Sequence, residues 1–315
     1  MATNGVNYTY PDVARRESLL DVIINIDPTE HQLVSGLQTS SASNTLHEWI
    51  TDTLESVGNN AQAEGADAPT DAAGEPSRVQ NVTQIFAKTA KVTNTELAVN
   101  RVGGDRMAQE LVDKLKALKN DIEYALVRGS IASGVASNSG SGSGRQLKGI
   151  KNWFDGTATT NTSNYSGATL TETLLNDMFE TVWNNSNKEV NAVYTTMKGK
   201  RRISGFTAGS TKNVMAEDKR LINSVDVYES DAAKLVKIFA HRYVTVSGDY
   251  VTTATPGFDV LALNEGSWAI AYLQGREPQT FDLSVTGDAK SKEIVTELTL
   301  EARAPRANYY GKLFF

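Results

Sequence analysis

The sequence predicts an α+β fold in which a projecting β-hairpin precedes one long helix and a strand-rich end. Residues 1–102 alternate polar, acidic stretches with β-branched segments. Residues 105–128 carry a single apolar stripe at helical spacing, and residues 224–302 contain several short β-branched or alternating runs. The chain has 315 residues, 40% hydrophobic and 22% charged, which is enough for one large domain or two smaller ones.

Composition excludes several classes of protein. The chain has no cysteine, so it forms no disulfide, zinc–thiolate site, iron–sulfur cluster or cysteine nucleophile. No apolar run approaches the roughly 20 residues that a membrane helix needs. Residues 1–10 lack the basic cluster and apolar stretch of a secretory signal. We therefore expect a soluble chain that matures in a cytoplasm and does not enter a membrane.

Charge is distributed unevenly along the chain. The net charge is −6, and residues 1–100 hold thirteen acidic and five basic side chains, against 24 and 26 in the remainder. One interpretation is a solvated acidic tail. The other is an extended arm that lies on a different, more basic surface, such as that of another copy. An acidic chain is in either case a poor candidate for tight binding of duplex DNA.

The first 45 residues predict an extended arm with one small anchoring segment. Residues 19–26 are apolar and β-branched, and Asp27 and Pro28 then predict a turn. Residues 38–44 are small and polar, like a linker. No sustained hydrophobic period is present in residues 1–45.

A long β-hairpin is predicted next. His47–Val57 reads as a strand anchored by Trp49, and Arg78–Val99 reads as the return strand system. Gly58–Pro76 between them is of low complexity and has no basic residue, which predicts a mobile loop. Because an isolated hairpin is exposed on both faces and only marginally stable, this one needs a partner surface.

The strongest helix signal follows the hairpin. Asp105 is a plausible N-cap, Gly129 ends the pattern, and Glu123 lies off the apolar face. Such a helix from Asp105 to Arg128 would be about 36 Å long. Its apolar stripe consists of Leu111, Leu115, Leu118, Ile122, Ala125 and Leu126.

The rest of the chain predicts a mixed middle and a strand-rich end. A second helix spans about Leu170–Asn185, with Thr169 and Glu172 as a capping box. A strand at Val190–Thr196 precedes a short helix that starts at Lys198 and ends near Phe206. Further strands are predicted at Ser224–Glu229, Leu235–Val246, Phe258–Leu263, Trp268–Leu273, Gln279–Val285 and Glu293–Ala302.

No motif predicts catalysis, a metal site or a cofactor. His31, His47 and His241 have no second histidine or carboxylate at metal-binding spacing, so each is expected at the surface or in packing. A Gly-x-Ser-x-Gly elbow is absent. The basic run Lys198–Arg202 could touch phosphate, but a solvated helix face or an interface contact is the favoured interpretation.

The order of an arm, a long hairpin, one long helix and a strand-rich end resembles the major capsid proteins of tailed bacteriophages with the Hong Kong 97-type fold. The resemblance covers most of residues 45–310 and rests on the order and spacing of five short sequence segments. These segments are His47–Leu54, Asn81–Phe86, Asp121–Gly129, Arg202–Phe206 and Val225–Ser230.

The resemblance implies a division of the chain into five parts. These are an N-terminal arm at 1–45, an extended loop at 46–102, a peripheral domain at 103–150 with its spine helix at 105–128, an axial domain at about 151–255, and closing strands of the peripheral domain at 256–315.

The resemblance also implies partners. Hexamers and pentamers of the chain would form an icosahedral shell around double-stranded DNA, without sequence-specific binding, in a virion assembled in the host bacterial cytoplasm. Roughly 45 residues before the extended loop are too few for a large scaffolding segment, so a separate scaffold is expected, besides portal and decoration proteins. No cofactor and no membrane are implied.

Inter-subunit contacts are expected where charges are complementary. Residues 46–78 carry seven acidic and one basic side chain, and we expect this tip to lie on a neighbour's more basic body. Lys88 and Lys91 are expected on the return strand, and no motif identifies partners for a covalent cross-link. The candidate contacts are Trp49, Glu55, Glu64, Asp67, Asp71, Glu75, Arg78, Lys88, Lys91, Lys198, Lys200, Arg201 and Arg202.

Three alternatives stay open at this point. A nanocompartment shell with the same fold would share every pattern above. A phage tail or decoration protein would share the composition, although the long helix after a hairpin argues against a tube made only of strands. An enzyme would need a cleft with converging polar groups, and the sequence offers no candidate set.

Overall fold

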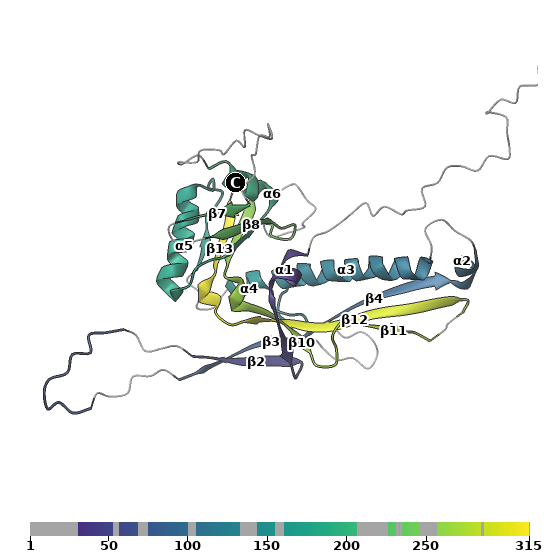
Figure 1. Ribbon diagram of the computed structural model, residues 1–315, viewed down its shortest axis with the longest axis horizontal. Coiled ribbons are helices and arrows are strands. Elements are labelled where there is room, and N and C mark those ends of the chain that lie inside the picture. Colours follow the sequence, from purple (N-terminus) through teal and green to yellow (C-terminus); the bar gives the residue numbers. More distant parts are fainter. Residues whose placement is uncertain are drawn as a thin grey trace, which may run out of the picture.

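A computed structural model gives the arrangement of the chain (Figure 1). It describes residues 31–52, 57–68, 75–99, 105–132, 144–154, 161–206, 226–230, 233, 235–245, 257–284 and 287–314. Helices and strands are both abundant, and the strands form a five-stranded sheet, a six-stranded sheet and a two-stranded hairpin. The predicted α+β class is confirmed.

A long helix on a long pair of strands forms one end of the molecule. α3 (Arg106–Arg128) packs along β4 (Gln84–Thr93), which is antiparallel to β12 (Ala289–Ala302) over ten residue pairs (Figure 1). The Asp105 carboxylate accepts a hydrogen bond from the Met107 N–H at 2.9 Å, which confirms the predicted N-cap. The helix ends at Gly129, as expected.

The five-stranded sheet contains a strand that the sequence did not indicate. β1 (Gln38–Ala42) is the stretch that resembled a linker, yet it pairs in parallel with β10 (Trp268–Leu273). β10 is largely buried and pairs antiparallel with residues 298–302 of β12. β11 (Gln279–Asp282) pairs with residues 292–295 of β12 on the same edge, and β4 pairs on the other edge. The prediction for residues 38–44 was wrong because the tertiary pairing outweighs the weak strand propensity of Ser and Gln.

The six-stranded sheet runs in the order β5-β13-β9-β6-β8-β7. α5 (Glu172–Ser186) covers one face with Leu175, Met178 and Phe179. Its N-cap is Thr171, whose hydroxyl accepts from the Leu174 N–H, so the predicted capping box with Thr169 was wrong. The strands are β5 (Thr162–Asn164), β6 (Ala192–Thr195), β7 (Val227–Tyr228), β8 (Val236–Ala240), β9 (Phe258–Leu263) and β13 (Tyr309–Phe314).

The hairpin is shorter than predicted. β2 (Leu46–Thr51) pairs with β3 (Ser77–Val82), and the ladder ends at Thr83, where the chain enters β4 and the other sheet. The predicted strand system Arg78–Val99 is divided between β3 and β4, and its last residues form the short helix α2 (Asn94–Ala98) instead of a strand. The hairpin projects from the body on the side opposite to the N-terminal end of α3 (Figure 1).

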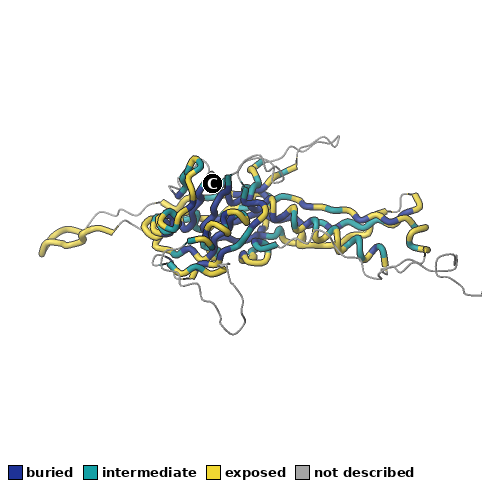
Figure 2. Tube along the Cα trace, turned by 90° about the horizontal axis from the view of Figure 1, so that it is seen from above, coloured by how far each residue is buried: buried dark blue, intermediate teal, exposed yellow. Residues whose placement is uncertain are grey.

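Two buried clusters meet at the six-stranded sheet. One joins α3, the short helices α1 (Gln32–Gly36) and α4 (Ile150–Phe154), and the five-stranded sheet to the near face of the six-stranded sheet. The other lies between α5 and the far face. Buried residues are concentrated in this body, and residues 57–68 beyond the hairpin are exposed (Figure 2).

Gly199 in α6 (Met197–Ser204) is expected to tolerate no side chain. A Cβ there would overlap the Thr195 hydroxyl and lie 2.9 Å from the Phe258 ring. Gly199→Ala should therefore lower the thermal midpoint, with an overpacking cost of about 1–3 kcal/mol that exceeds the helix-propensity gain of about 1 kcal/mol. Gly58→Ala is the matched control, because nothing lies within 4 Å of its added Cβ. A Gly199→Ala midpoint equal to or above wild type would contradict this.

Candidate functional site

The root of the hairpin is fixed on the body by side chains that reach distant backbone. Trp49 Nε1 donates to the Ala302 carbonyl at 3.0 Å, and its ring lies 5.8 Å from that of Trp153. The Asn81 amide donates to the Leu300 carbonyl at 2.7 Å and accepts from the Lys148 N–H at 2.8 Å. The hairpin therefore leaves the body at a defined angle, although its outer part has no core of its own.

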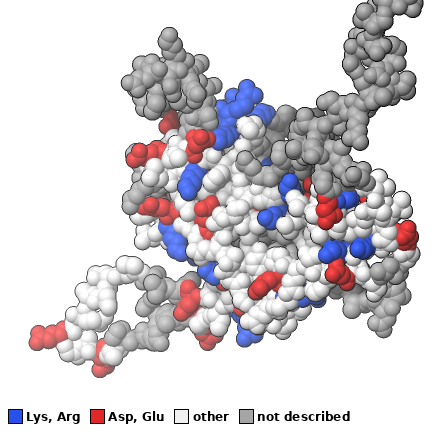
Figure 3. Space-filling view, turned by 45° about the vertical axis from the view of Figure 1, so that its right-hand side comes forward, with Lys and Arg blue, Asp and Glu red and all other residues white. Residues whose placement is uncertain are grey.

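The outer part of the hairpin presents acidic and apolar side chains to solvent. Ile50 is 72% exposed, and the neighbouring ion pair between Arg78 and Glu48, at 3.4 Å, is exposed as well. Glu64 and Asp67 lie on the exposed loop, which carries no Lys or Arg within residues 57–68 (Figure 3). Glu75 is also exposed, whereas Glu55 and Asp71 lie outside the described residues.

Lys88 and Lys91 do not lie on the hairpin. Both are on β4, opposite Ile294 and Ser291 of β12, so their predicted place on the return strand was wrong. Lys88 Nζ lies 2.6 Å from the Asp121 carboxylate on α3. Lys88 thus joins the helix to its own sheet.

Basic side chains gather on α6. Lys198, Arg201 and Arg202 line a cavity of about 310 Å³, and Lys200 Nζ lies 2.6 Å from the Asp226 carboxylate. Figure 3 shows Lys and Arg side chains at the upper end of the body, the end that carries α6. Within one chain, α6 and the acidic loop at residues 57–68 lie apart (Figure 1).

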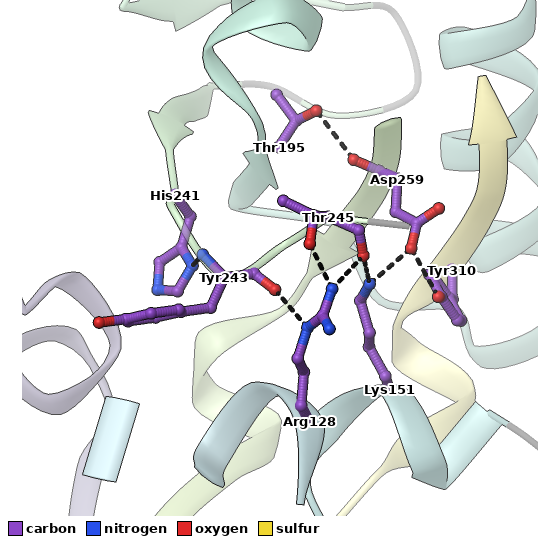
Figure 4. A network of polar contacts seen from close by, with 8 residues as sticks. All are labelled: Arg128, Lys151, Thr195, His241, Tyr243, Thr245, Asp259 and Tyr310. Atoms are coloured by element: carbon purple, nitrogen blue, oxygen red, sulfur yellow. Dashed lines mark hydrogen bonds and ion pairs between the residues drawn. The ribbon is translucent and has the colours of Figure 1, made fainter. Parts of the chain in front are cut away.

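A buried polar network joins the end of α3 and α4 to the six-stranded sheet (Figure 4). Lys151 Nζ donates to the Asp259 carboxylate and to the Thr245 carbonyl, each at 2.5 Å. Tyr310 Oη donates to the same carboxylate at 2.8 Å. Arg128 donates to the carbonyls of Tyr243 and Thr245 at 3.0 and 2.8 Å. We name this group the junction network.

A second buried group holds the first described segment of the chain. The Glu123 carboxylate accepts from the N–H groups of Leu33 and Val34 at 2.8 and 3.0 Å, and it pairs with His241 Nε2 at 2.9 Å. Glu123 and His241 are nearly inaccessible to solvent. The sequence placed Glu123 off the apolar stripe of α3, and the structure adds that α1 covers that side of the helix and buries the carboxylate.

The polar face of β12 is also covered. Glu297 accepts from the Thr83 hydroxyl at 2.6 Å and from Arg145 at 2.5 Å, and Arg276 approaches it at 3.4 Å. Glu301 accepts from Ser40 at 2.8 Å and from Arg303 at 3.0 Å. The side of the strand that alternation assigns to solvent is therefore buried by partners from distant parts of the chain.

Acid is expected to weaken the contact between β1 and β12. Burial alone would raise the pKa of Glu301, but hydrogen bonds from Arg303 and Ser40 and the charges of Arg303 and His47 outweigh it and lower that pKa. Because the folded pKa lies below the unfolded one, this stabilisation is complete above about pH 4.5 and is lost as the pH falls through the folded value. Thermal melts across this range should show a shallower pH slope for Glu301→Gln than for wild type. Equal slopes would contradict the assignment.

Sequence reasoning missed the charged residues of these networks. Asp259 stands within the otherwise apolar run Phe258–Leu263, and Lys151 lies between Ile150 and the aromatic pair Trp153 and Phe154. A charged residue at such a place is the available signal, because a buried charge requires a partner. His241 is buried, in agreement with the expected packing role.

Among the described residues no group of three His, Cys, Asp or Glu could hold a metal ion. Nor is any helix in the described ranges long and apolar enough to cross a membrane. The buried polar groups described above are partnered with one another in the core. The described part of the chain thus combines two packed sheets with an exposed hairpin and loop.

Comparisons with known proteins agree with this arrangement. The major capsid protein of Escherichia phage Phieco32 is 32% identical over 138 residues, which is 43% of this chain and only 39% of that relative's length. The capsid of a native GTA particle is similar in structure, with a TM-score of 0.63, 10% identity and coverage of 96% and 95% of the two chains.

Two further structures show the same fold. The capsid of cyanophage P-SCSP1u has a TM-score of 0.60 at 10% identity, covering 95% of this chain and 93% of the other. The SrpI encapsulin of Synechococcus elongatus PCC 7942 has 0.59 at 12% identity, covering 94% and 92%. These likenesses confirm the expected Hong Kong 97-type fold. The SU10 major capsid protein family matches residues 2–312, and since that is nearly the whole sequence, the chain belongs to this family.

Proposed function

We propose that this protein is the subunit of an icosahedral capsid shell, built from pentamers and hexamers, that encloses the double-stranded DNA of a tailed bacteriophage. The family match over residues 2–312 is the observation that carries the proposal. The exposed outer hairpin supports it, because Ile50 and the acidic loop have no partner surface within the described part of their own chain. The role is structural and involves no catalysis.

The parts of the chain receive roles on the same basis. Residues 1–45 are the arm, 46–102 the extended loop, 103–150 and 256–315 the peripheral domain, and about 151–255 the axial domain. The packing of α3 on β4 and β12 supports a peripheral domain that is continuous across distant sequence. Assembly in the host cytoplasm with separate scaffold, portal and decoration proteins completes the proposal.

Charge complementarity would set the register between neighbours. The exposed Glu64 and Asp67 carry no local cation, and Lys198, Arg201 and Arg202 form a basic surface elsewhere on the body. Since exposed charge pairs are screened by salt, the association of subunits should weaken as ionic strength rises. The isosteric pair Glu64→Gln with Asp67→Asn should reduce this salt dependence.

Electron microscopy of the expressed chain, with size-exclusion chromatography, tests the proposal. Closed shells, or discrete pentamers and hexamers, are expected, either from the chain alone or after co-expression with its scaffold. A chain that stays monomeric at high concentration in both settings would contradict the proposal. The encapsulin likeness makes the contents informative: nucleic acid in particles from infected cells supports a genome container, and protein cargo without nucleic acid contradicts it.

A further inference from the structure

His31 and α1, the first residues that the structure describes, lie against α3. Leu33 is fully buried, and the Glu123 carboxylate holds the first turn of α1 through two N–H groups. The His31 ring lies 3.4 Å from the Lys116 carbonyl. Residues before His31 therefore start beside the middle of α3, where one contact between arm and helix already exists.

An exposed stripe continues along α3 from this point towards its N-terminal end. Val112 is 51% exposed and Leu115 is 37% exposed, although both lie within a helix whose other apolar residues are largely buried. Ala108 and Lys119 are exposed as well, and helical spacing puts all four on one face. We call Ala108, Val112, Leu115 and Lys119 the α3 stripe.

Residues 19–26 are the part of the arm with the composition to cover this stripe. Their sequence, LLDVIINI, is the apolar run of the first 30 residues. Ile26 lies five residues before His31, and five extended residues reach about 17 Å. Val112 lies only about 6 Å along the helix axis from Lys116, so the run can reach the stripe.

Charge favours the same pairing. Residues 17–30 contain Glu17, Asp21, Asp27 and Glu30 and no Lys or Arg. The stripe ends at Lys119 and is bordered by Lys116, and both lysines are exposed. An acidic, apolar segment thus has an apolar surface edged by positive charge directly beside its point of attachment.

We propose that residues 19–26 dock along the α3 stripe of the same chain, extending the contact that α1 begins. The short tether favours the chain's own helix, because it holds the segment at high effective concentration over the stripe. The docked arm would shield Val112 and Leu115 and fix where the acidic N-terminal residues leave the body. This inference does not depend on shell formation.

Engineered cysteines test the proposal directly, since the natural chain contains none. Ile24→Cys with Leu115→Cys should form a disulfide within the chain, seen as a faster monomer band on non-reducing gels. Ile24→Cys with Asp113→Cys is the matched control, because exposed Asp113 lies about 200° around the helix from Leu115. We expect on the order of tenfold faster disulfide formation in the first pair, since docking keeps residue 24 beside the face of α3 that carries residue 115.

The same gels separate the other occupants. A disulfide between chains appears as a dimer and would show that a neighbour's arm covers the stripe, which overturns the proposal. Equal rates for the two pairs would overturn it as well. Electron micrographs of the same samples report shell formation separately, so failure of the proposed function is distinguishable from failure of the docking.

Hydrogen exchange provides a measurement without cysteines. Val112→Ser with Leu115→Ser should make residues 19–26 exchange on the order of tenfold faster, because docking protects their amides. Ile131→Ser, at an exposed site beyond the end of α3, should leave their exchange unchanged. Fast exchange of residues 19–26 already in the wild-type chain would contradict the proposal.

Discussion

Replacing Glu123 by Ala is expected to detach α1 from α3 and to lower the free energy of unfolding by about 3–5 kcal/mol. The carboxylate is almost inaccessible and accepts from two backbone N–H groups and from His241. Without it, these donors stay buried and lose their acceptor, which costs more than the removal of an exposed pair. Urea unfolding followed by tryptophan fluorescence measures the loss.

Two variants separate this effect from loss of charge alone. Glu123→Gln keeps the side-chain volume and one acceptor oxygen, so its loss should be smaller than that of Glu123→Ala. Glu48→Ala removes an exposed carboxylate paired with Arg78 and should cost at most about 0.5 kcal/mol. If Glu123→Ala unfolded at the same urea concentration as Glu48→Ala, the buried carboxylate would not hold α1.

Sequence patterns predicted the elements that have a strong hydrophobic pattern or local end signals. The long helix has one apolar stripe, a side-chain cap at Asp105 and a glycine end, and its observed bounds agree with the prediction within one residue. The strands Phe258–Leu263 and Trp268–Leu273 were predicted with the observed bounds because both are short, apolar and bordered by polar turns. The order of elements was enough to indicate the fold class.

Elements that depend on a distant partner were not predicted. β1 has the polar sequence QTSSA and becomes a strand only beside buried β10. β13 contains Gly311 and pairs with β9 and β5, which are far away in sequence. The chain passes from β3 of the hairpin to β4 of the five-stranded sheet at Thr83, and this break depends on the contacts of Thr83 with Thr45 and Glu297. Residue patterns within a window contain none of these contacts.

The buried charges were missed for a related reason. Periodicity assigns Glu123 to the outer side of α3 because it reports only the face that meets the sheet, and a second element, α1, covers another side. In β12, Glu297 and Glu301 alternate with apolar residues, a pattern typical of a strand with one solvent-facing side, yet both are buried. A fold with several layers covers more than one side of an element, so a single hydrophobic face underestimates burial.

Asp259→Ala should be as disruptive as the change at Glu123, because it leaves the Lys151 ammonium in the junction network without its carboxylate. The Asp259 side chain is 3% exposed and Lys151 is 11% exposed, so little water replaces the lost partner. We expect a loss of about 3–5 kcal/mol in the free energy of unfolding. Asp226→Ala is the matched control: its pair with Lys200 has almost the same length, 2.6 Å against 2.5 Å, but Asp226 is 75% exposed and should cost no more than about 1 kcal/mol.

A double variant shows whether the cost comes from the stranded charge. Lys151→Met with Asp259→Leu removes both charges and keeps the volume, so it should recover much of the stability that Asp259→Ala loses. Since the network joins α4 to β9 and β13, the single variant should also weaken the packing of α4 against the six-stranded sheet. Hydrogen exchange should then rise in β9 and β13 before it rises in the centre of α3. Uniform exchange across these elements would mean that the junction network has no separate role in holding α4 against that sheet.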